Sequence, residues 1–327
     1  MPKPVLFSSD RPLYRADNLR MVWNAYGGEK EFVHGVARAC ASLSDRYSVF
    51  VTDEIPQYSP TKGDVKTVFI SHGITGDKLY GLDCSESHRA GAEQVDFAVC
   101  CNSFYAGMRT ASQLALSADR VLRLGLPVTD WYFGKSKGDG CTVLAKHGRS
   151  YLYAPTWRAR GNPPLPAIDW RKLDLMMEPD EMIVVKRHMC TAKPIVGESL
   201  HHVIEADSME PSMPYVVDCD VLATDFSSVL FDGYIAGKPS VLVTDGYRDY
   251  CRVHGMYEAY PDFYGSRAVE AEGNEEGFLA ALRDAAETGI GAAELRCIDL
   301  VAGFGNRIDG HASERVAALV AKLAEGE

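Results

Sequence analysis

The sequence of 327 residues lacks any run of about 18 or more apolar residues, so no membrane-spanning helix is predicted. Its start, Met1 to Pro4 followed by Val5, Leu6 and Phe7, predicts a first buried strand rather than a signal peptide. A basic excess is also missing, because the formal net charge is -11. Nucleic-acid binding is therefore not expected, since no basic face is visible that could bind a phosphate backbone.

Cysteine pairs with a regular spacing are absent as well. Nine cysteines are present, of which Cys100 and Cys101 are adjacent and the others are scattered without a C-x-x-C spacing. An odd, irregular set of this kind indicates reduced and mostly buried thiols in a cytoplasmic protein. It also argues against a structural zinc site.

The charge that is present is unevenly placed. Residues 1–150 carry 18 Lys and Arg against 16 Asp and Glu, whereas residues 151–327 carry 16 against 29. We interpret the acidic half mainly as a solvated surface. An anionic ligand would then have to be held by local hydrogen-bond donors.

Short β-rich runs alternate with helical periodicity, which predicts an α/β fold with parallel sheets. In the first part of the chain the expected strands are 5–8, 47–52, 65–71, 95–101 and 120–124, and the expected helices are 31–43 and 104–116. In the second part the expected strands are 151–154, 182–186, 221–224 and 240–244, and the expected helices are 168–177, 228–236, 275–287 and 312–324. The length fits two domains, and the Gly- and Lys-rich residues 134–148 are the candidate linker.

The most informative segment follows the strand expected at 221–224. Thr224 and Asp225 end this strand, and Ser227 and Ser228 precede an amphipathic helix. A serine here can cap the helix, or its hydroxyl can donate to a phosphate at the helix start. A cap explains one serine but not two serines and an aspartate together.

Two further strands are expected to end in cations. Thr156, Trp157 and Arg158 follow the strand at 151–154, and arginine suits phosphate because its planar fork donates two hydrogen bonds. The alternative is a surface arginine beside a packed tryptophan. His188 ends the run Ile183-Val-Val-Lys-Arg-His188, and its alternative is an ordinary polar loop residue.

A histidine is also expected at the end of a strand in the first domain. The run Val68-Phe-Ile-Ser-His72-Gly73 places His72 there, followed by a glycine that lets the backbone turn, with Lys78 downstream. His201 and His202 do not predict a metal site, because adjacent residues in a strand point to opposite faces.

Taken in order, these segments resemble the CDP-glycerol glycerophosphotransferase family, the teichoic-acid polymerases and primases. The likeness runs from about residue 65 to the end of the chain. It rests on five motifs: Ser71-His72-Gly73 with Lys78, Ala154-Pro-Thr-Trp-Arg158, Val185-Lys-Arg-His188, Asp225-Phe-Ser-Ser228 with Phe231-Asp232, and Asp309-Gly-His-Ala-Ser-Glu-Arg315.

The resemblance implies a GT-B fold, in which two Rossmann-like domains face a cleft. We place the acceptor-side domain at 1–140 and the donor-binding domain at 141–327, with the last helix able to pack back on the first domain. It also implies transfer of glycerol phosphate or a related polyol phosphate from a CDP-activated donor to an acceptor hydroxyl, with release of CMP, in cell-wall or capsule polymer synthesis. The acceptor would be a polyol phosphate or a glycan.

The resemblance also implies roles for single residues. His72 is the expected general base, and His188 is the second catalytic candidate, which with Arg158, Ser227 and Ser228 would hold the diphosphate. The remaining candidates are Thr156, Thr224, Asp225 and Asp232 on the donor side, and Gly73 and Lys78 on the acceptor side. Asp225 and Asp232 can orient a histidine or arginine rather than touch the ligand. No metal ion or cofactor is implied.

Two departures from the family pattern leave alternatives open. Phe226 replaces the usual tyrosine, and Met189 and Cys190 follow His188 where the family has proline. The alternatives are a GT-B sugar-nucleotide glycosyltransferase and a catalytically silent nucleotide-binding homologue. Without an amphipathic cationic helix, membrane association is not favoured. The sequence does not predict the oligomeric state.

Overall fold

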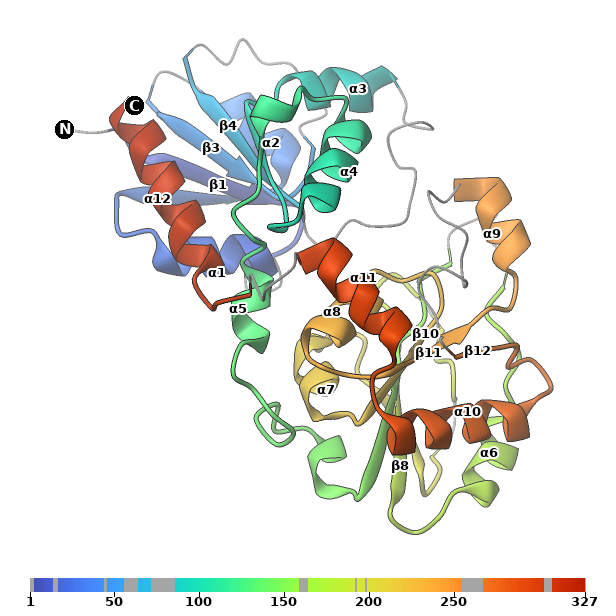
Figure 1. The fold of residues 1–327 in the computed structure, drawn as a ribbon. Helices are drawn as coiled ribbons and strands as arrows, with labels where there is room; N and C mark the ends of the chain where they lie inside the picture. The colour runs from blue at the N-terminus through green and yellow to red at the C-terminus, as the bar shows by residue number, and fades with distance from the viewer. Residues whose placement is uncertain are drawn as a thin grey trace. The chain divides into compact units, whose positions relative to one another are not determined.

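The computed structural model describes residues 3–13, 17–43, 46–55, 64–71, 86–158, 164–191, 193–197, 199–254, 267–302 and 308–326. The chain forms two compact units, one of Met1–Phe133 with Asp299–Glu327 and one of Gly134–Ile298 (Figure 1). Within the described residues, no helix is both long enough and apolar enough to cross a membrane.

The first unit is built on a parallel sheet with the strand order β2-β1-β3-β4-β5-β6. Its strands are β1 (Val5–Ser9), β2 (Lys30–His34), β3 (Val49–Thr52), β4 (Lys66–Ile70), β5 (Phe97–Val99) and β6 (Val121–Leu122). Its helices are α1 (Asp17–Ala25), α2 (Val36–Ser42), α3 (Glu86–Glu93), α4 (Phe104–Leu114), α5 (Val128–Tyr132) and α12 (Ala312–Glu325). The central strands β1 and β3 are buried along their whole length, as continuous apolar strands of parallel sheets are.

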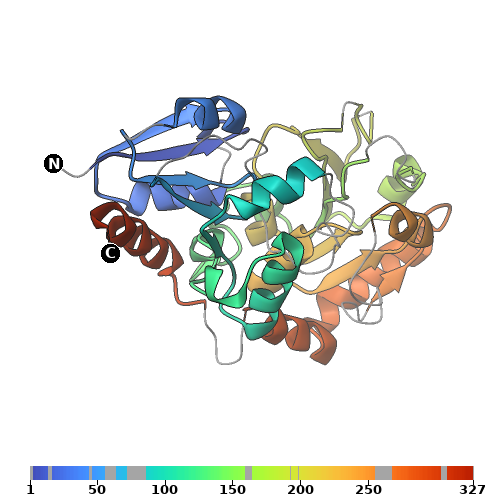
Figure 2. The same cartoon turned by 90° about the horizontal axis from the view of Figure 1, so that it is seen from above.

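The last helix, α12, belongs to the first unit. It packs against α1, α5 and β3, and it lies beside α1 in both ribbon views (Figures 1 and 2). The carboxylate of Asp130 accepts hydrogen bonds from the backbone N–H groups of Ala312 (2.9 Å) and Ser313 (2.7 Å) and so caps this helix. Arg315 Nε donates to the carbonyl of Leu124 at 2.7 Å. The motif from Asp309 to Arg315 therefore fastens the end of the chain to the first unit.

The second unit contains a parallel sheet with the strand order β12-β11-β10-β7-β8-β9. Its strands are β7 (Arg149–Tyr153), β8 (Glu181–Lys186), β9 (Val203–Ala206), β10 (Val221–Thr224), β11 (Ser240–Val243) and β12 (Ala268–Val269). Its helices are α6 (Trp170–Met176), α7 (Met213–Asp218), α8 (Val229–Ile235), α9 (Tyr247–His254) and α10 (Glu275–Thr288), and α11 (Ala292–Ala302) runs across the division between the units. The order reverses between β7 and β10, which makes this the topological switch point of the sheet.

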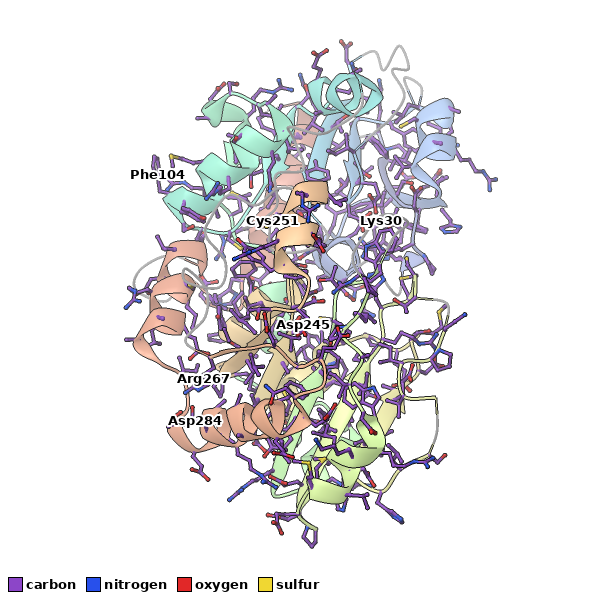
Figure 3. All side chains as sticks on the ribbon, turned by 90° about the vertical axis from the view of Figure 1, so that its right-hand side faces the viewer. Lys30, Phe104, Asp245, Cys251, Arg267 and Asp284 are labelled. Atoms are coloured by element: carbon purple, nitrogen blue, oxygen red, sulfur yellow. The ribbon has the colours of Figure 1, made fainter. Side chains whose placement is uncertain are left out.

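The core of the second unit gathers around the central strand β7. The ring of Tyr153 packs against those of Trp170 (5.7 Å between centroids) and Phe278 (5.9 Å). At the far edge, Arg267 Nε donates to Asp284 Oδ2 at 2.9 Å and so ties the start of β12 to α10 (Figure 3). The aromatic contacts of Tyr153 thus pack β7 against α6 and α10.

One predicted helix is wrong. Residues 31–43 were expected to be helical throughout, but the chain forms β2 as far as His34 and only then the helix α2. Gly35 separates the two with a φ of 94°, a conformation that favours glycine. The aromatic and β-branched pair Phe32 and Val33 fits a strand beside β1 better than a helix. The other predicted elements are present, with ends shifted by two residues or fewer.

The expected linker at 134–148 is fastened to the second unit rather than free. The buried carboxylate of Asp218 accepts hydrogen bonds from the N–H groups of Gly138 (2.8 Å), Gly140 (3.0 Å) and Thr142 (2.7 Å). The structure divides the chain at Phe133, so residues 134–140 lie in the second unit and not in the first. The sequence pattern could not reveal this, because Asp218 is distant along the chain.

Candidate functional site

Three of the segments singled out in the sequence meet at one edge of the second sheet. The strands β10, β7 and β8 are neighbours and run parallel, so their carboxyl ends lie side by side. Asp225 follows β10, Arg158 follows β7 and His188 follows β8. Ligands of open α/β sheets bind beyond such strand ends, at the switch point.

An ion pair spans the switch point. Arg158 Nη2 donates to Asp225 Oδ2 at 2.7 Å, and the Asp225 side chain is 1% exposed while that of Arg158 is 11% exposed. The second carboxylate oxygen of Asp225 accepts from the N–H of Thr156 at 2.7 Å. Arg158 Nη1 also donates to the carbonyl of Thr156 at 3.0 Å. Asp225 therefore fixes the loop after β7 and the direction of its guanidinium.

An aromatic ring lies beside the same guanidinium. The Arg158 guanidinium carbon is 5.5 Å from the centre of the Phe226 ring, within the range of a cation–π contact. Phe226 is fully buried and stacks on Tyr250 of α9 at 4.4 Å between centroids. The phenylalanine that departs from the family pattern is thus part of the core and helps to position Arg158.

Several polar atoms around this pair have no hydrogen-bond partner among the described residues. They are Thr156 Oγ1, Arg158 Nε and the hydroxyl of Tyr153. Buried polar groups are usually hydrogen-bonded, so unpaired ones at a strand edge are notable. Burial, followed by the nearby Asp225 carboxylate, raises the pKa of Tyr153 well above its ordinary value and keeps its hydroxyl protonated. Thr224 differs, because its hydroxyl donates to the Ala154 carbonyl at 2.7 Å.

The two serines lie half-buried before α8. Ser228 is the N-cap residue, but its side chain makes no capping hydrogen bond. Ser227 Oγ accepts from the N–H of Val229 only at the long distance of 3.5 Å. Of the two alternatives for these serines, capping by the Ser228 side chain is not observed, because the backbone of Ser228 is itself helical (φ -63°, ψ -15°). Asp232 lies half-buried in the first turn of α8.

All three polar side chains at the end of β8 have contacts within the fold. Lys186 Nζ donates to the carbonyls of Arg187 (3.2 Å) and Ser208 (3.3 Å). Arg187 Nε lies 2.8 Å from Glu205 Oε1. His188 is exposed and its Nδ1 accepts a hydrogen bond from the N–H of Cys190 at 3.1 Å.

The three expected acceptor-side and base residues, His72, Gly73 and Lys78, lie outside the described residues. The preceding Ser71 is buried, and its carbonyl accepts from Asn18 Nδ2 at 2.7 Å. The role of His72 therefore remains a prediction from the resemblance.

Within the described part of the chain, no group of three or more histidine, cysteine, aspartate or glutamate side chains could hold a metal ion. Two aspartates, Asp218 and Asp220, are spaced as Asp-x-Asp. Both carboxylates have structural partners, because Asp218 holds the 138–142 turn and Asp220 accepts from Lys137 Nζ (2.7 Å) and Ser150 N (2.8 Å). His202 Nδ1 lies 3.0 Å from the Glu181 carbonyl, a contact within the fold.

Two parallel α/β units, one of which places an arginine, serines and a histidine at its switch point, define a protein of the GT-B type. The particular family follows from comparison with known sequences. The family model described as CDP-Glycerol:Poly(glycerophosphate) glycerophosphotransferase matches residues 14–322, and the chain belongs to this family.

Individual relatives are more distant. The chain is 22% identical over 300 residues to the teichoic acid poly(ribitol-phosphate) polymerase of Bacillus spizizenii, a match that covers 79% of the chain and 48% of the relative. It is 26% identical over 153 residues to the teichoic acid glycerol-phosphate primase of Bacillus subtilis, covering 46% and 40%. The chain thus spans less than half the length of these curated relatives.

Among solved structures, the wall teichoic acid polymerase TagF has a similar fold. A TagF structure superposes with a TM-score of 0.74 at 18% identity and covers 100% of this chain and 90% of that one. Another TagF structure was determined after a 15 minute soak with CDPG. At this identity the likeness shows the fold alone.

Proposed function

We propose that this chain transfers glycerol phosphate, or ribitol phosphate, from a CDP-activated donor to an acceptor hydroxyl with release of CMP. Family membership and the teichoic acid relatives support the reaction class. The soak of TagF with CDPG supports a CDP-linked donor. A wall or capsule polymer ending in a polyol phosphate is the proposed acceptor.

The reaction exchanges one phosphorus–oxygen bond for another. The acceptor oxygen attacks the β-phosphorus, and the bond from that phosphorus to the bridging oxygen breaks. CMP leaves with the bonding electron pair, and the proton of the acceptor hydroxyl passes to a base, for which His72 is proposed. Because charge grows on the departing CMP, positioned cations and hydrogen-bond donors supply most of the catalysis.

The Arg158–Asp225 pair at the switch point of the second sheet carries the proposal. With a carboxylate along one side and the Phe226 ring near it, the guanidinium keeps one orientation, and its Nε has no partner among the described residues. A diphosphate can accept from this group and from the hydroxyls of Thr156, Ser227 and Ser228. Asp225 thus acts as a positioning residue for Arg158 and needs no contact with the donor.

His188 is the proposed second catalytic residue. Because its Nδ1 accepts from Cys190, the proton of the neutral ring is on Nε2, and the ring can donate to a phosphate oxygen. Thr224 is not proposed to contact the donor, since its hydroxyl already donates to the carbonyl of Ala154. Gly73 and Lys78 remain proposed on the acceptor side.

The test is release of CMP from CDP-glycerol and from CDP-ribitol, followed by chromatography, with a polyol-phosphate acceptor. We expect the unaltered chain to release CMP from one of them, His72→Ala to abolish release, and Arg158→Ala to lower it by about 100-fold or more. Normal turnover by both variants would contradict the mechanism.

Calorimetric titration with CDP, CMP, UDP and GDP tests the donor class separately. The proposal predicts that CDP binds most tightly. A preference for UDP or GDP would instead favour a sugar-nucleotide glycosyltransferase of the same fold. Tight binding of CDP-glycerol with no CMP release, in the presence of either acceptor type, would favour a catalytically silent homologue.

A further inference from the structure

The loop after β7 carries an exposed tryptophan whose position the core does not explain. Trp157 is 41% exposed, although large apolar side chains such as tryptophan are usually well buried. Its neighbours Thr156 and Arg158 both bind the buried carboxylate of Asp225. The backbone of Trp157 is therefore held from both sides, and the indole is presented in a fixed place.

The indole meets the imidazole of His188. The two rings are stacked, with centroids 6.1 Å apart and planes inclined by 25°. Offset stacking at this range is a favourable arrangement for aromatic rings. The contact joins the loop after β7 to the loop after β8, and both loops border the switch-point edge.

The imidazole is also held through its own loop. The N–H of Cys190 donates to Nδ1 at 3.1 Å, and the N–H of Thr191 donates to the His188 carbonyl at 2.9 Å. The hydrogen bond to Nδ1 selects the tautomer with the proton on Nε2. The stack restricts the plane of the ring, so that ring plane and tautomer are defined together.

We propose that Trp157 is a positioning residue that holds the His188 imidazole for the transfer reaction. The expected effects on kcat rest on the proposed function, whereas the expected effects on the His188 ring do not. Trp157 needs no contact with the donor for this role.

The experiment compares Trp157→Phe, which keeps a ring, with Trp157→Leu, which does not. We expect Trp157→Leu to lower kcat for CMP release about 3- to 30-fold and Trp157→Phe to restore most of it. Combined with His188→Gln, the Trp157→Leu change should lower kcat no further, because the indole acts through the imidazole. Leu175→Ala, which removes an apolar side chain that is 82% exposed in the same unit, is the matched control with unchanged kcat.

A second readout needs no substrate. The imidazole resonances of His188, assigned by their loss in His188→Gln, should show the ring-current shift of a stacked indole and a protonated Nε2. We expect Trp157→Leu to remove the shift and Trp157→Phe to keep part of it. Unchanged His188 resonances in Trp157→Leu, or unchanged kcat in that variant, would overturn the positioning role. If the unaltered chain releases no CMP while the stacking shifts are present, the proposed function fails instead.

Discussion

The two sheets each have a topological switch point, and each switch point is crossed by an arginine–aspartate pair. In the second unit Arg158, after β7, pairs with Asp225, after β10, at 2.7 Å. In the first unit Arg11, after β1, pairs with Asp53, after β3, at 2.8 Å. The order of the strands therefore places the same two residue types at the same position of two differently ordered sheets.

The surroundings of the two pairs differ. Around Arg158 there are an aromatic ring and hydroxyl groups. Further carboxylates lie near Arg11. Glu54 Oε1 lies 4.0 Å from Arg11 Nη2. Asp17 also interacts electrostatically with Arg11, and burial raises the pKa of Asp17. Desolvation, and then the Asp53 carboxylate, raises the pKa of Glu54 to about 7. The described residues of the second edge therefore include several hydrogen-bond donors, whereas those of the first edge include several carboxylates.

The largest expected effect comes from removing one carboxylate. Asp225→Ala leaves the guanidinium of Arg158 buried without a counter-charge and should lower the free energy of unfolding by about 3–5 kcal/mol. Asp53→Ala is the matched variant, and its arginine is 23% exposed against 11% for Arg158, so the loss should be smaller. Urea denaturation measures both, and an equal loss would show that the two pairs are energetically alike.

The next effect separates the two arginines in ligand binding. Arg158→Lys keeps the charge but loses the planar fork, so the Kd for CDP should rise by about 10- to 100-fold. Arg11→Lys should leave that Kd within about twofold, because the first edge is rich in carboxylates. Calorimetric titration checks both variants. An equal rise of the Kd for CDP in both variants would contradict the proposal that CDP binds at the switch point of the second sheet.

A smaller effect concerns pH and the first edge. Since the pKa of Glu54 is about 7 in the folded protein against an ordinary 4.5, the folded state binds more protons between these values. The contribution of Glu54 to the stability of the folded state is therefore complete below pH 4.5, and it is lost as the pH rises through about 7. Glu54→Gln should abolish this decline and be more stable at pH 8 by about 1 kcal/mol, a modest figure because solvent screens a side chain that is 34% exposed.

The control for that experiment is Glu276→Gln, which removes the same charge from a side chain that is 75% exposed. Unfolding free energies of both variants and the unaltered chain are measured between pH 4 and pH 8. A pH dependence in Glu54→Gln that matches the unaltered chain would show that Glu54 is not the group that titrates.

The smallest effect on stability is expected at Ser228. Because its side chain makes no capping bond, Ser228→Ala should change the free energy of unfolding by less than about 0.5 kcal/mol. In the first unit Ser103 Oγ accepts from the N–H of Ala106 at 2.9 Å, so Ser103→Ala should cost about 1 kcal/mol. If Ser228 binds the donor, its variant alone should weaken CDP binding. A large stability loss in Ser228→Ala would restore the capping role.

Much of this fold could be predicted from local pattern. The strands β1, β3, β7 and β10 are visible in the sequence as short continuous apolar runs, and the helices α4, α10 and α12 are visible because their apolar residues repeat with a helical period. Strands β2, β9 and β12 were missed. They lie at sheet edges, where partial exposure weakens the apolar signal, as the half-buried residues of β2 illustrate.

The candidate site was predicted as a set of segments but not as a set of contacts. Thr156, Arg158, Asp225 and His188 were identified because each follows a strand. The roles of Phe226 and Tyr153 were not seen, since an aromatic residue in an apolar segment looks like any core residue. The sequence analysis allowed that Asp225 orients a histidine or an arginine, and the structure identifies the partner as Arg158.

The sequence by itself determined the alternation of strands and helices, the residue types at the strand ends and the family, because each is a local property of the chain. Only the tertiary structure decided which charges are used within the fold and which remain for a ligand. Arg187, Asp218 and Asp220 form ion pairs or hydrogen bonds with other residues of the fold. The guanidinium of Arg158 is oriented by its ion pair with Asp225. The reason is physical: a charge is neutralised by what lies near it in space, and those partners are 18 to 83 residues away along the chain.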